Sequence, residues 1–382
     1  MGVLICYKPL RGIIMNKENL HEIISRYETH YAEINNKENN EIFKWKAVKC
    51  FQQEWFSPNN DGLPFSILLS KAKQETSVLI DNSTVSPANG IVKMAEQEET
   101  EVKRLFCEVL FAEDNGDLAL RQQHMEEFLD GIEKVRLKHF PGSWKYAQDR
   151  HAASCYLALF APEKNYIYKY THAENFAQYI EYGKDLGSGN NFSLANYYEM
   201  CDLVVEALKE HPSLLKAYYE LLTDGYYYDD SLHLLAFDVI YCASTYHLFT
   251  GLQHKAKHET IKAYKLEQLR QAEAEKLRAE IEVLEAQIQT LDLQLDMYRS
   301  INLLGVQVNE KHYGTGTVVS QNINTIKVAF ADGERSYIIS KKYPMRPTFE
   351  DDVQIVQAMT EYEQKLVERK GLENQLHKLL KN

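Results

Sequence analysis

Apolar side chains recur at helical spacing through most of the first 250 residues, which predicts a run of amphipathic helices. A loop rich in Asn, Pro and Gly interrupts the pattern at 57–62, and Ser86-Pro87 is typical of a helix start. The alternating segment Tyr166–Tyr170 predicts a short strand. The helical patterns cover residues 16–56, 65–72, 102–110, 118–137, 173–182, 194–210 and 231–248. We therefore predict one mainly helical domain over residues 15–250, with minor strand content.

The pattern changes in the last third of the chain. Apolar residues there are spaced alternately by four and three positions, as on the core positions of a coiled coil. They are Leu277, Ile281, Leu284, Ile288, Leu291, Leu295 and Tyr298. A looser stripe returns over 350–382, with Ile355, Met359, Tyr362, Leu366, Arg369, Glu373, Leu376 and Leu380 at core positions. We predict two arms, 251–303 and 350–382, that pair as an antiparallel hairpin, while a parallel dimer of the first arm is the competing arrangement.

Between the two arms, residues 304–346 alternate apolar and polar positions, with turns at Gly314-Thr315-Gly316 and Asp332-Gly333. Several short strands in so short a segment predict a small SH3/Tudor-like β-barrel. The predicted fold class is α+β, mainly α: a helical N-terminal domain, a coiled-coil hairpin stalk and a small SH3-like β-barrel at its tip.

The N-terminal residues 1–14 are apolar and precede the first helical pattern. We interpret them as a possible leader or a mis-assigned start, and favour translation from Met15. No run of about 18 apolar residues occurs, so no membrane span is predicted. The six cysteines form no CxxC pair, which indicates reduced core thiols and a cytoplasmic location.

The formal net charge of −12 is distributed unevenly. Residues 1–250 hold 24 Lys+Arg and 36 Asp+Glu, whereas residues 301–350 hold 6 and 4. This charge argues against nonspecific DNA binding by the helical domain and leaves the predicted barrel free to meet a polyanion.

Catalytic motifs are few. The chain has no P-loop motif, so no nucleotide hydrolysis and no cofactor are predicted. Asp81, Glu101 and Lys103 have the spacing of a carboxylate–carboxylate–lysine nuclease site, although no hairpin pattern surrounds them. We regard an enzyme as the less favoured class, with these residues as its catalytic candidates.

Acidic residues gather between 224 and 238, and Asp229, Asp230 and Asp238 are candidate ligands for Mg²⁺ or Mn²⁺. The competing interpretation is an acidic loop followed by a helix cap, which we favour.

Two segments combine aromatic and basic residues, as nucleic-acid or partner-binding surfaces do. Near the predicted strand, the alternative is that the tyrosines lie in the core, and we favour it. The first set is Lys164, Tyr166, Tyr168 and Lys169. The second set, in the predicted barrel, is Lys311, His312, Tyr313, Arg335, Lys341 and Lys342.

Two partial resemblances bear on function. The segments Gly305–Val308, Tyr313–Val319, Ile326–Phe330 and Asp332–Gly333 resemble the small SH3/Tudor-like barrels of UvrD-type helicases and CarD-like transcription factors. In those families the module contacts nucleic-acid machinery, often RNA polymerase. The resemblance implies such a contact for residues 304–346.

The larger part of the chain resembles the N-terminal regions of McrB-like restriction and defence ATPases of bacteria. The residues that carry this resemblance are Phe43–Val48, Phe51, Gln52, Trp55, Arg104–Phe106, Leu110, Phe111, Asp149, Arg150, Tyr156–Lys164, Tyr168 and Lys169. In that family the region serves target recognition ahead of an AAA+ motor, and here no motor follows.

From these observations we expect a non-catalytic interaction protein that is associated with nucleic acid or acts as the recognition component of a bacterial defence system. The expected partners are a protein or a second copy through the coiled coil, and DNA or nucleic-acid machinery through the barrel. A metal-dependent nuclease and a purely structural coiled-coil scaffold are the alternatives.

Overall fold

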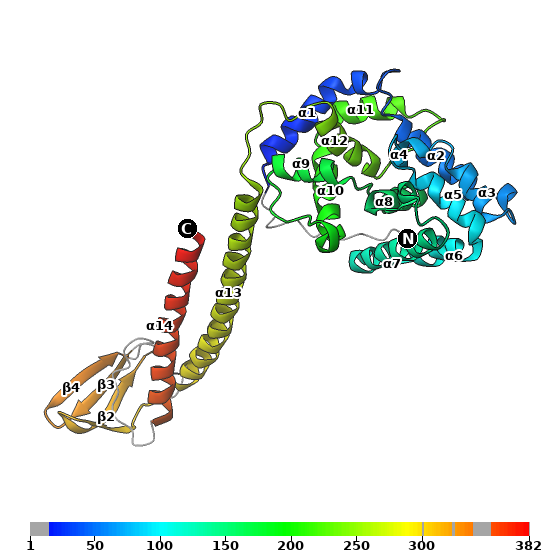
Figure 1. Cartoon of the computed structure of the whole chain (residues 1–382). Coiled ribbons are helices and arrows are strands. Elements are labelled where there is room, and N and C mark those ends of the chain that lie inside the picture. The colour runs from blue at the N-terminus through cyan, green and yellow to red at the C-terminus, as the bar shows by residue number, and fades with distance from the viewer. Residues whose placement is uncertain (1–14, 300–301, 323–324, 339–352, 382) are drawn as a thin grey trace. The chain divides into compact units, whose positions relative to one another are not determined.

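The computed structural model describes the chain except residues 1–14, 300–301, 323–324, 339–352 and 382. The chain divides into two compact units, Met1–Lys265 and Leu266–Asn382. Among the described residues, strands occur only in one small antiparallel sheet of the second unit, and helices make up most of the rest (Figure 1). The predicted mainly helical α+β class is confirmed.

The first unit is a set of helices, several of which begin at a side chain that accepts a hydrogen bond from a first-turn N–H. Asn16, Asp117, Asp149 and Ser193 cap α1, α7, α8 and α10 in this way. The helices are α1 Lys17–Ile34, α2 Phe43–Trp55, α3 Phe65–Ala72, α4 Ser77–Ile80, α5 Pro87–Gln97, α6 Glu99–Arg104, α7 Leu118–His139, α8 Arg150–Phe160, α9 Tyr170–Tyr179, α10 Leu194–Leu208, α11 Pro212–Leu221 and α12 His233–Thr245. Short helical turns are η1 Pro58–Asn60, η2 Leu105–Leu110, η3 Trp144–Tyr146 and η4 Gly189–Asn191.

Two helices form the interior of this unit. Every residue of α8 from Ala152 to Leu159 is buried, as expected for a helix that is apolar on all sides. It packs against α2, α4 and α7, while α12 packs against α1, α9 and α10 (Figure 1).

The predicted strand at 166–170 is wrong. Residues 165–169 belong to neither a helix nor a strand, and α9 begins at Tyr170. Side chains satisfy the backbone instead: Ser154 accepts from the Tyr168 N–H at 2.8 Å, and the Tyr197 hydroxyl donates to the Ile167 carbonyl at 2.5 Å. Because side chains of α8 and α10 form hydrogen bonds with these backbone groups, a neighbouring strand is not required to do so.

The two predicted arms are helical. They are α13, Lys257–Arg299, and α14, Val353–Lys381. The first turns of α13 belong to the first unit, where the Lys257 ammonium lies 2.6 Å from Glu174 and 2.9 Å from Asp185. The first unit therefore extends beyond the predicted boundary at residue 250.

Within the second unit, α13 and α14 run antiparallel. The Arg270 guanidinium donates to the Leu379 carbonyl at 2.8 Å, and the Lys365 ammonium donates to the Gln287 side chain at 2.7 Å. As the residue number rises along one helix it falls along the other, which is the order of a hairpin. That the pair winds as a coiled coil remains a prediction.

The α13 stripe is buried as its spacing predicts, with Ile281 half-buried and the side chain of Tyr298 outside the described residues. On α14 the predicted stripe is one residue out of step near its end, because Glu373 is exposed and Leu380 is 57% exposed. Leu372 and Leu379 are half-buried in their place. An additional three-residue step after Arg369 shifts the stripe, as stammers do in heptad patterns.

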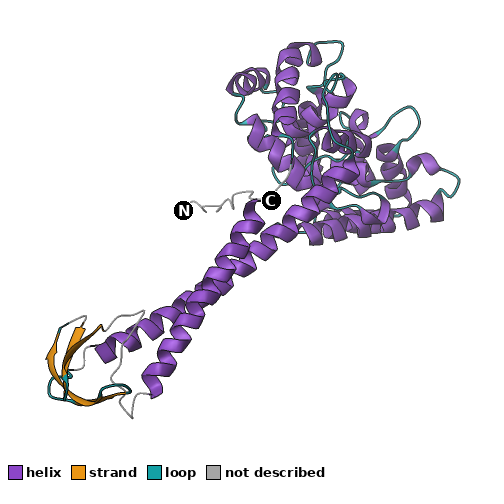
Figure 2. Cartoon of the chain, turned by 90° about the vertical axis from the view of Figure 1, so that its left-hand side faces the viewer, coloured by secondary structure: helices purple, strands orange, loops and turns teal. Residues whose placement is uncertain are grey.

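The sheet, orange in Figure 2, lies between the arms in sequence. It has the order β1–β2–β3–β4, with every neighbouring pair antiparallel. Its strands are β1 Gln307–Glu310, β2 Gly314–Gln321, β3 Thr325–Phe330 and β4 Gly333–Ile338. At Gly316 a Cβ atom would lie 2.8 Å from the Ala329 carbonyl oxygen, so only glycine fits there. The buried side chains of the sheet are Val308, Val318, Ile326, Val328, Phe330 and Tyr337. The described strands β1 and β4 are not paired with each other, and closure into a barrel stays a prediction.

The helix pair offers a matched test of its packing. Leu284 is 7% exposed and the adjacent Val283 is 57% exposed on the same helix. We expect Leu284→Ala to lower the free energy of unfolding of the second unit by about 2 kcal/mol through lost apolar burial. Val283→Ala should change it by less than about 0.5 kcal/mol.

Urea unfolding of the full chain, followed by circular dichroism, measures both variants. Equal effects would contradict the packing of the stripe. A midpoint that rises with protein concentration would favour the parallel dimer over the intrachain hairpin.

Candidate functional site

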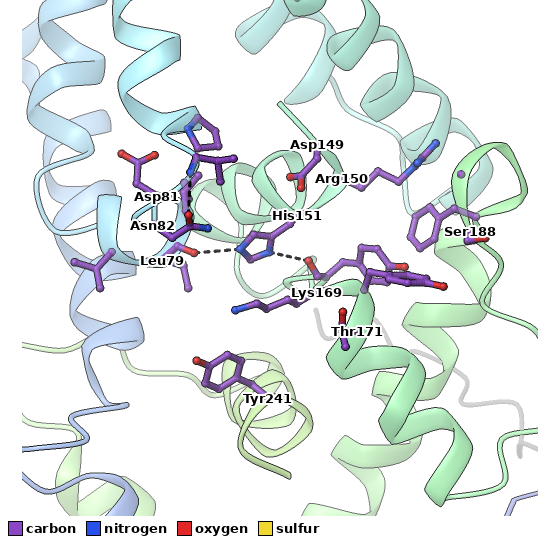
Figure 3. Close-up of a pocket in the computed structure, with 18 residues that line it drawn as sticks. Leu79, Asp81, Asn82, Asp149, Arg150, His151, Lys169, Thr171, Ser188 and Tyr241 are labelled. Atoms are coloured by element: carbon purple, nitrogen blue, oxygen red, sulfur yellow. Dashed lines mark hydrogen bonds between the residues drawn. The ribbon is translucent and has the colours of Figure 1, made fainter. Parts of the chain in front are cut away.

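A pocket of about 750 Å³ opens in the first unit where the chain enters α5, α8 and α9 (Figure 3). Its wall is formed by the segment from α4 to the start of α5, the first residues of α8, and residues 168–171. The volume lies within the range of small-molecule sites in proteins. This pocket is the candidate functional site.

Three helix N-termini meet at the pocket, and two of them are capped by carboxylates. Asp81 accepts hydrogen bonds from the Ala88 N–H at 2.8 Å and the Asn89 amide at 2.7 Å, at the start of α5. Asp149 accepts from the Ala152 N–H at 2.9 Å, at the start of α8. The N-cap residue of α9 is Lys169, whose side chain makes no capping bond. The positive end of α9 is thus the one that faces the pocket without a carboxylate.

Lys169 carries the most distinctive charge in the pocket. Its half-buried ammonium lies 4.7 Å from the centre of the Tyr241 ring (Figure 3). Among the described residues, no carboxylate lies within ion-pair distance of it. Burial, and then the positive charge of Lys44, lower the pKa of Lys169. The pocket therefore holds a cation that lacks a matching anion.

His151 joins two walls of the pocket through both ring nitrogens. Nδ1 lies 2.8 Å from the Tyr168 carbonyl oxygen and Nε2 lies 3.1 Å from that of Leu79 (Figure 3). A neutral imidazole has one N–H and can donate to one of them. Burial lowers the pKa of His151.

Cys155 lies one helical turn along, with its Sγ 3.7 Å from His151 Nδ1. A cysteine nucleophile acts as the thiolate, but burial raises the pKa of Cys155 well above its ordinary value. The pair is therefore a packing contact within α8.

Behind the pocket, the His172 ring stacks on Tyr241 with ring centres 4.7 Å apart. Burial, together with the charges of Lys169 and His151, lowers the pKa of His172 to about 4. The Lys44 ammonium lies 4.5 Å from the centre of the same Tyr241 ring. Tyr241 thus contacts both the pocket and a buried ionic cluster.

That cluster, which we call the Lys44 cluster, consists of Glu41, Lys44 and Asp238 with the hydroxyls of Tyr27 and Tyr246. The Lys44 ammonium pairs with Glu41 and with Asp238, the latter at 2.5 Å. Tyr27 donates to Asp238 at 2.5 Å and Tyr246 to Glu41 at 2.9 Å. Although burial alone lowers the pKa of Lys44, the charges of Asp238 and Glu41 raise it above its ordinary value.

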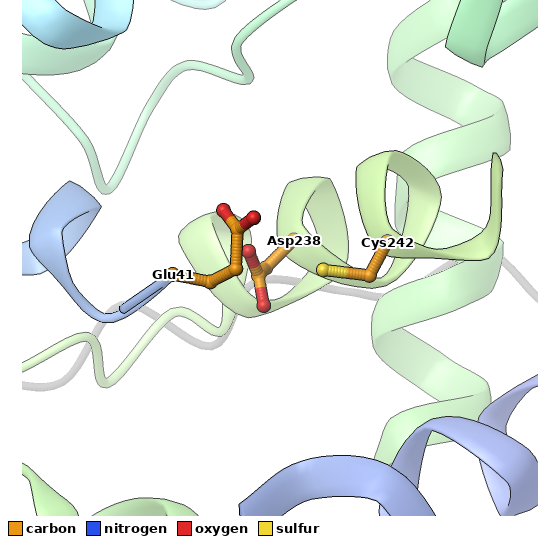
Figure 4. A group of neighbouring side chains, drawn as sticks. All are labelled: Glu41, Asp238 and Cys242. Atoms are coloured by element: carbon orange, nitrogen blue, oxygen red, sulfur yellow. The ribbon is translucent and has the colours of Figure 1, made fainter. Parts of the chain in front are cut away.

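Glu41, Asp238 and Cys242 have the spacing of a metal-ligand set, with one ligand atom of each within 4.8 Å of the others (Figure 4). The Lys44 ammonium already supplies a cation to both carboxylates. Burial raises the pKa of the Cys242 thiol well above its ordinary value, which disfavours the thiolate that a metal requires. This group is accounted for as a structural ion pair.

The predicted metal ligands are not brought together. Among the described residues, Asp229, Asp230 and Asp238 form no common ligand group. The buried Asp229 carboxylate accepts from the N–H groups of Leu234 at 3.0 Å and Leu235 at 3.1 Å, while Asp230 is exposed. The favoured alternative, a helix cap, is confirmed for Asp229, and the interpretation of these residues as one metal site is wrong.

The predicted nuclease residues are likewise separate. Asp81 caps α5, whereas Glu101 forms a bidentate pair with Arg104 on α6, at 2.9 Å for each bond. Lys103 lies on the same helix and is exposed. Asp81 and Glu101 line different pockets. The hairpin that such a site requires is replaced here by a helix, so the constellation is not formed.

The first predicted binding surface is also corrected. Tyr166 and Tyr168 are 2% and 4% exposed, so their rings are not available to stack on bases. The Tyr166 hydroxyl donates to Asp202 at 2.6 Å, and exposed Lys164 lies 3.6 Å from Glu113. The alternative with tyrosines in the core is confirmed, and of this set Tyr168 and Lys169 line the pocket.

In the sheet, Lys311, His312 and Tyr313 are exposed at the turn between β1 and β2. The Arg335 guanidinium lies 3.8 Å from the centre of the Tyr313 ring. Lys341 and Lys342 lie outside the described residues.

No family model matches this chain, and neither a curated protein nor a solved structure matches it. None of the helices in the described ranges has a stretch long and apolar enough to cross a bilayer.

The pocket and the Lys44 cluster were not predicted from the sequence. A lysine beside the apolar stripe of 42–51 and an aspartate within the apolar run 234–240 were the features that could have indicated the cluster.

The His172 environment predicts a pH dependence of stability. Its folded pKa of about 4 lies below the ordinary value of 6.5, so folding favours the neutral ring. That contribution is complete above pH 6.5 and is lost as the pH falls toward 4. We expect His172→Phe, which keeps the ring stacked on Tyr241, to reduce the loss of stability between pH 7 and pH 5.

Urea unfolding at the two pH values measures this difference. The same substitution at the exposed His258 is the control and should leave the pH dependence unchanged. An identical pH dependence in the wild type and in His172→Phe would refute the assignment.

Proposed function

We propose that this chain is a non-catalytic interaction protein that docks a protein partner through the turn between β1 and β2 of its second unit. The observation that carries the proposal is the fixed geometry of Tyr313. Tyr313 is 42% exposed, yet its ring contacts Arg335 and Phe330.

Backbone and side-chain contacts both fix the turn. The Glu310 carboxylate accepts from the N–H groups of His312 at 2.7 Å and Tyr313 at 2.9 Å. The Arg335 guanidinium packs on the Tyr313 ring and is itself held by Asp332 at 2.7 Å. A side chain that is ordered before binding loses less conformational entropy when a partner arrives. Tyrosine and arginine are also the residues that most often dominate protein interfaces.

The charges favour a protein over direct contact with nucleic acid. Asp332 neutralises Arg335, and Glu334 lies 3.9 Å from the Lys327 ammonium. Of the described cations in the sheet, this leaves Lys311 to meet a phosphate. Because affinity for nucleic acid rises with the number of phosphates neutralised, these residues supply little of it.

The resemblances extend the proposal to a setting. On the UvrD-type and CarD-like resemblance, the sheet closes as a small barrel and its partner belongs to nucleic-acid machinery. On the McrB-like resemblance, the first unit is the recognition part of a bacterial defence complex in the cytoplasm. In the same proposal, α13 and α14 pair as a coiled coil that carries the sheet.

A photocrosslinking amino acid placed at His312 in the full chain, expressed in its native cell, tests the docking surface. We expect one protein adduct, reduced about tenfold by Tyr313→Ala because the ring anchors the interface. The control is Tyr228→Ala, which removes an exposed tyrosine of the first unit and should leave the adduct unchanged. An adduct with nucleic acid, or one insensitive to Tyr313→Ala, would contradict the proposal.

The nuclease alternative has its own outcome. Since Asp81 and Glu101 are engaged in a helix cap and an ion pair, we expect supercoiled plasmid to survive incubation with the protein and Mg²⁺ or Mn²⁺. Cleavage that disappears in Glu101→Ala would replace the interaction protein with an enzyme.

A further inference from the structure

The pocket of the first unit remains unused by the proposed docking function. Its walls combine three kinds of group. A cation without a matching carboxylate lies at its inner side, carboxylates that cap helices lie at one edge, and exposed apolar side chains lie at its rim. We propose that it binds a small phosphorylated molecule of the nucleotide class, with the phosphate beside Lys169.

The Lys169 ammonium and the N-terminus of α9 are the groups that favour a phosphate. A half-buried ammonium that lacks an anion is costly to keep, and a ligand phosphate supplies the missing partner. Among the described residues, no oxygen accepts from the N–H groups of Tyr170, Thr171 or His172, which open α9. These donors belong to the three residues that follow Lys169 in the chain.

The other cations in the pocket wall are already engaged. The Arg150 guanidinium forms a bidentate pair with Glu126, at 2.7 and 2.9 Å. Both ring nitrogens of His151 face carbonyl oxygens. A single unmatched positive charge fits one phosphate better than a polyphosphate chain, which favours a nucleoside monophosphate.

The body of the ligand follows from the remaining walls. Tyr170 and Val78 are 50% and 70% exposed at the rim and offer an apolar surface to a planar base. Asp81 and Asn82 stand at the edge that precedes α5 (Figure 3). Their side-chain oxygens already accept from backbone N–H groups, and the lone pairs that remain can accept from sugar hydroxyls. The volume of about 750 Å³ accommodates a ligand of this size.

Lys169 has a competing role that the test must separate. The Lys44 cluster holds two carboxylates and one ammonium, and Lys169 shares the Tyr241 ring with Lys44. Lys169 could therefore balance the cluster and take no ligand. In that case Lys169→Met changes stability alone, and no nucleotide binds.

Isothermal titration of the full chain with AMP, GMP, CMP and UMP in turn, and with the parent nucleosides, tests the proposal. We expect at least one monophosphate to bind, with its nucleoside bound at least about tenfold more weakly because the charge-assisted bonds are lost. Lys169→Met should weaken the monophosphate by a similar factor, and Lys169→Arg should restore it. Lys164→Met is the matched control, since Lys164 precedes the segment, is exposed and does not line the pocket.

A second variant keeps the test decisive if Lys169→Met does not fold. Tyr170 is half exposed, so Tyr170→Ala should retain the fold and weaken the monophosphate about fivefold or more through lost stacking. Absence of binding by every monophosphate at millimolar concentration overturns the proposal. So does affinity that is equal for nucleotide and nucleoside, or that is unchanged in both Lys169→Met and Tyr170→Ala.

Discussion

The first unit depends on one buried ionic interaction, that of Lys44 with Glu41 and Asp238. Removing an ammonium from water costs several kcal/mol, and the two carboxylates offset this cost only while all three groups keep their positions. The tyrosine hydroxyls from α1 and from the end of α12 complete the arrangement. Since the partners come from α1, α2 and α12, the cluster requires these helices to meet in one register. Breaking the arrangement by removal of one partner leaves a buried charge without its counter-charge, which is strongly destabilising.

The pocket depends on the same cluster. Tyr241 forms part of the pocket wall, and the ammonium groups of Lys44 and Lys169 lie 4.5 Å and 4.7 Å from the centre of its ring. The ring therefore connects an interior charge balance with an exposed cavity. A change of charge in the pocket acts on the cluster at short range through a weakly polar medium, where electrostatic interactions are strong. Beside this ring, burial is the main cause of the lowered pKa values of Lys169 and His172, and neighbouring positive charges lower them further.

Local patterns predicted the local elements well. The stripe on α13 and the alternation in β1 to β3 are patterns of residues that are close in sequence. Their spacing alone therefore indicates which side chains are buried. The prediction was wrong where tertiary contacts replace a local rule. Residues 166–168 alternate like a strand, but Ser154 and Tyr197 take the hydrogen bonds that a neighbouring strand would have made. The prediction of Glu373 as a core residue of α14 was wrong for a smaller reason. The buried stripe contains a three-residue step that a strict heptad count does not allow.

The pocket lay beyond such rules, because it is made by segments near residues 80, 150, 170 and 241 that only the packed fold brings together. The sequence did contain a signal for the Lys44 cluster. Lys44 and Asp238 are 194 residues apart, yet each is a charged residue inside an otherwise apolar stretch. A charge at a core position is tolerated only when an opposite charge meets it, so each such residue implies a partner in another buried stretch. Matching the unexplained lysine of one helix with the unexplained aspartate of another would have predicted the contact of α2 with α12. The same argument applied to Lys169 finds no carboxylate among the described residues, and this missing anion is the strongest reason to look for it in a ligand.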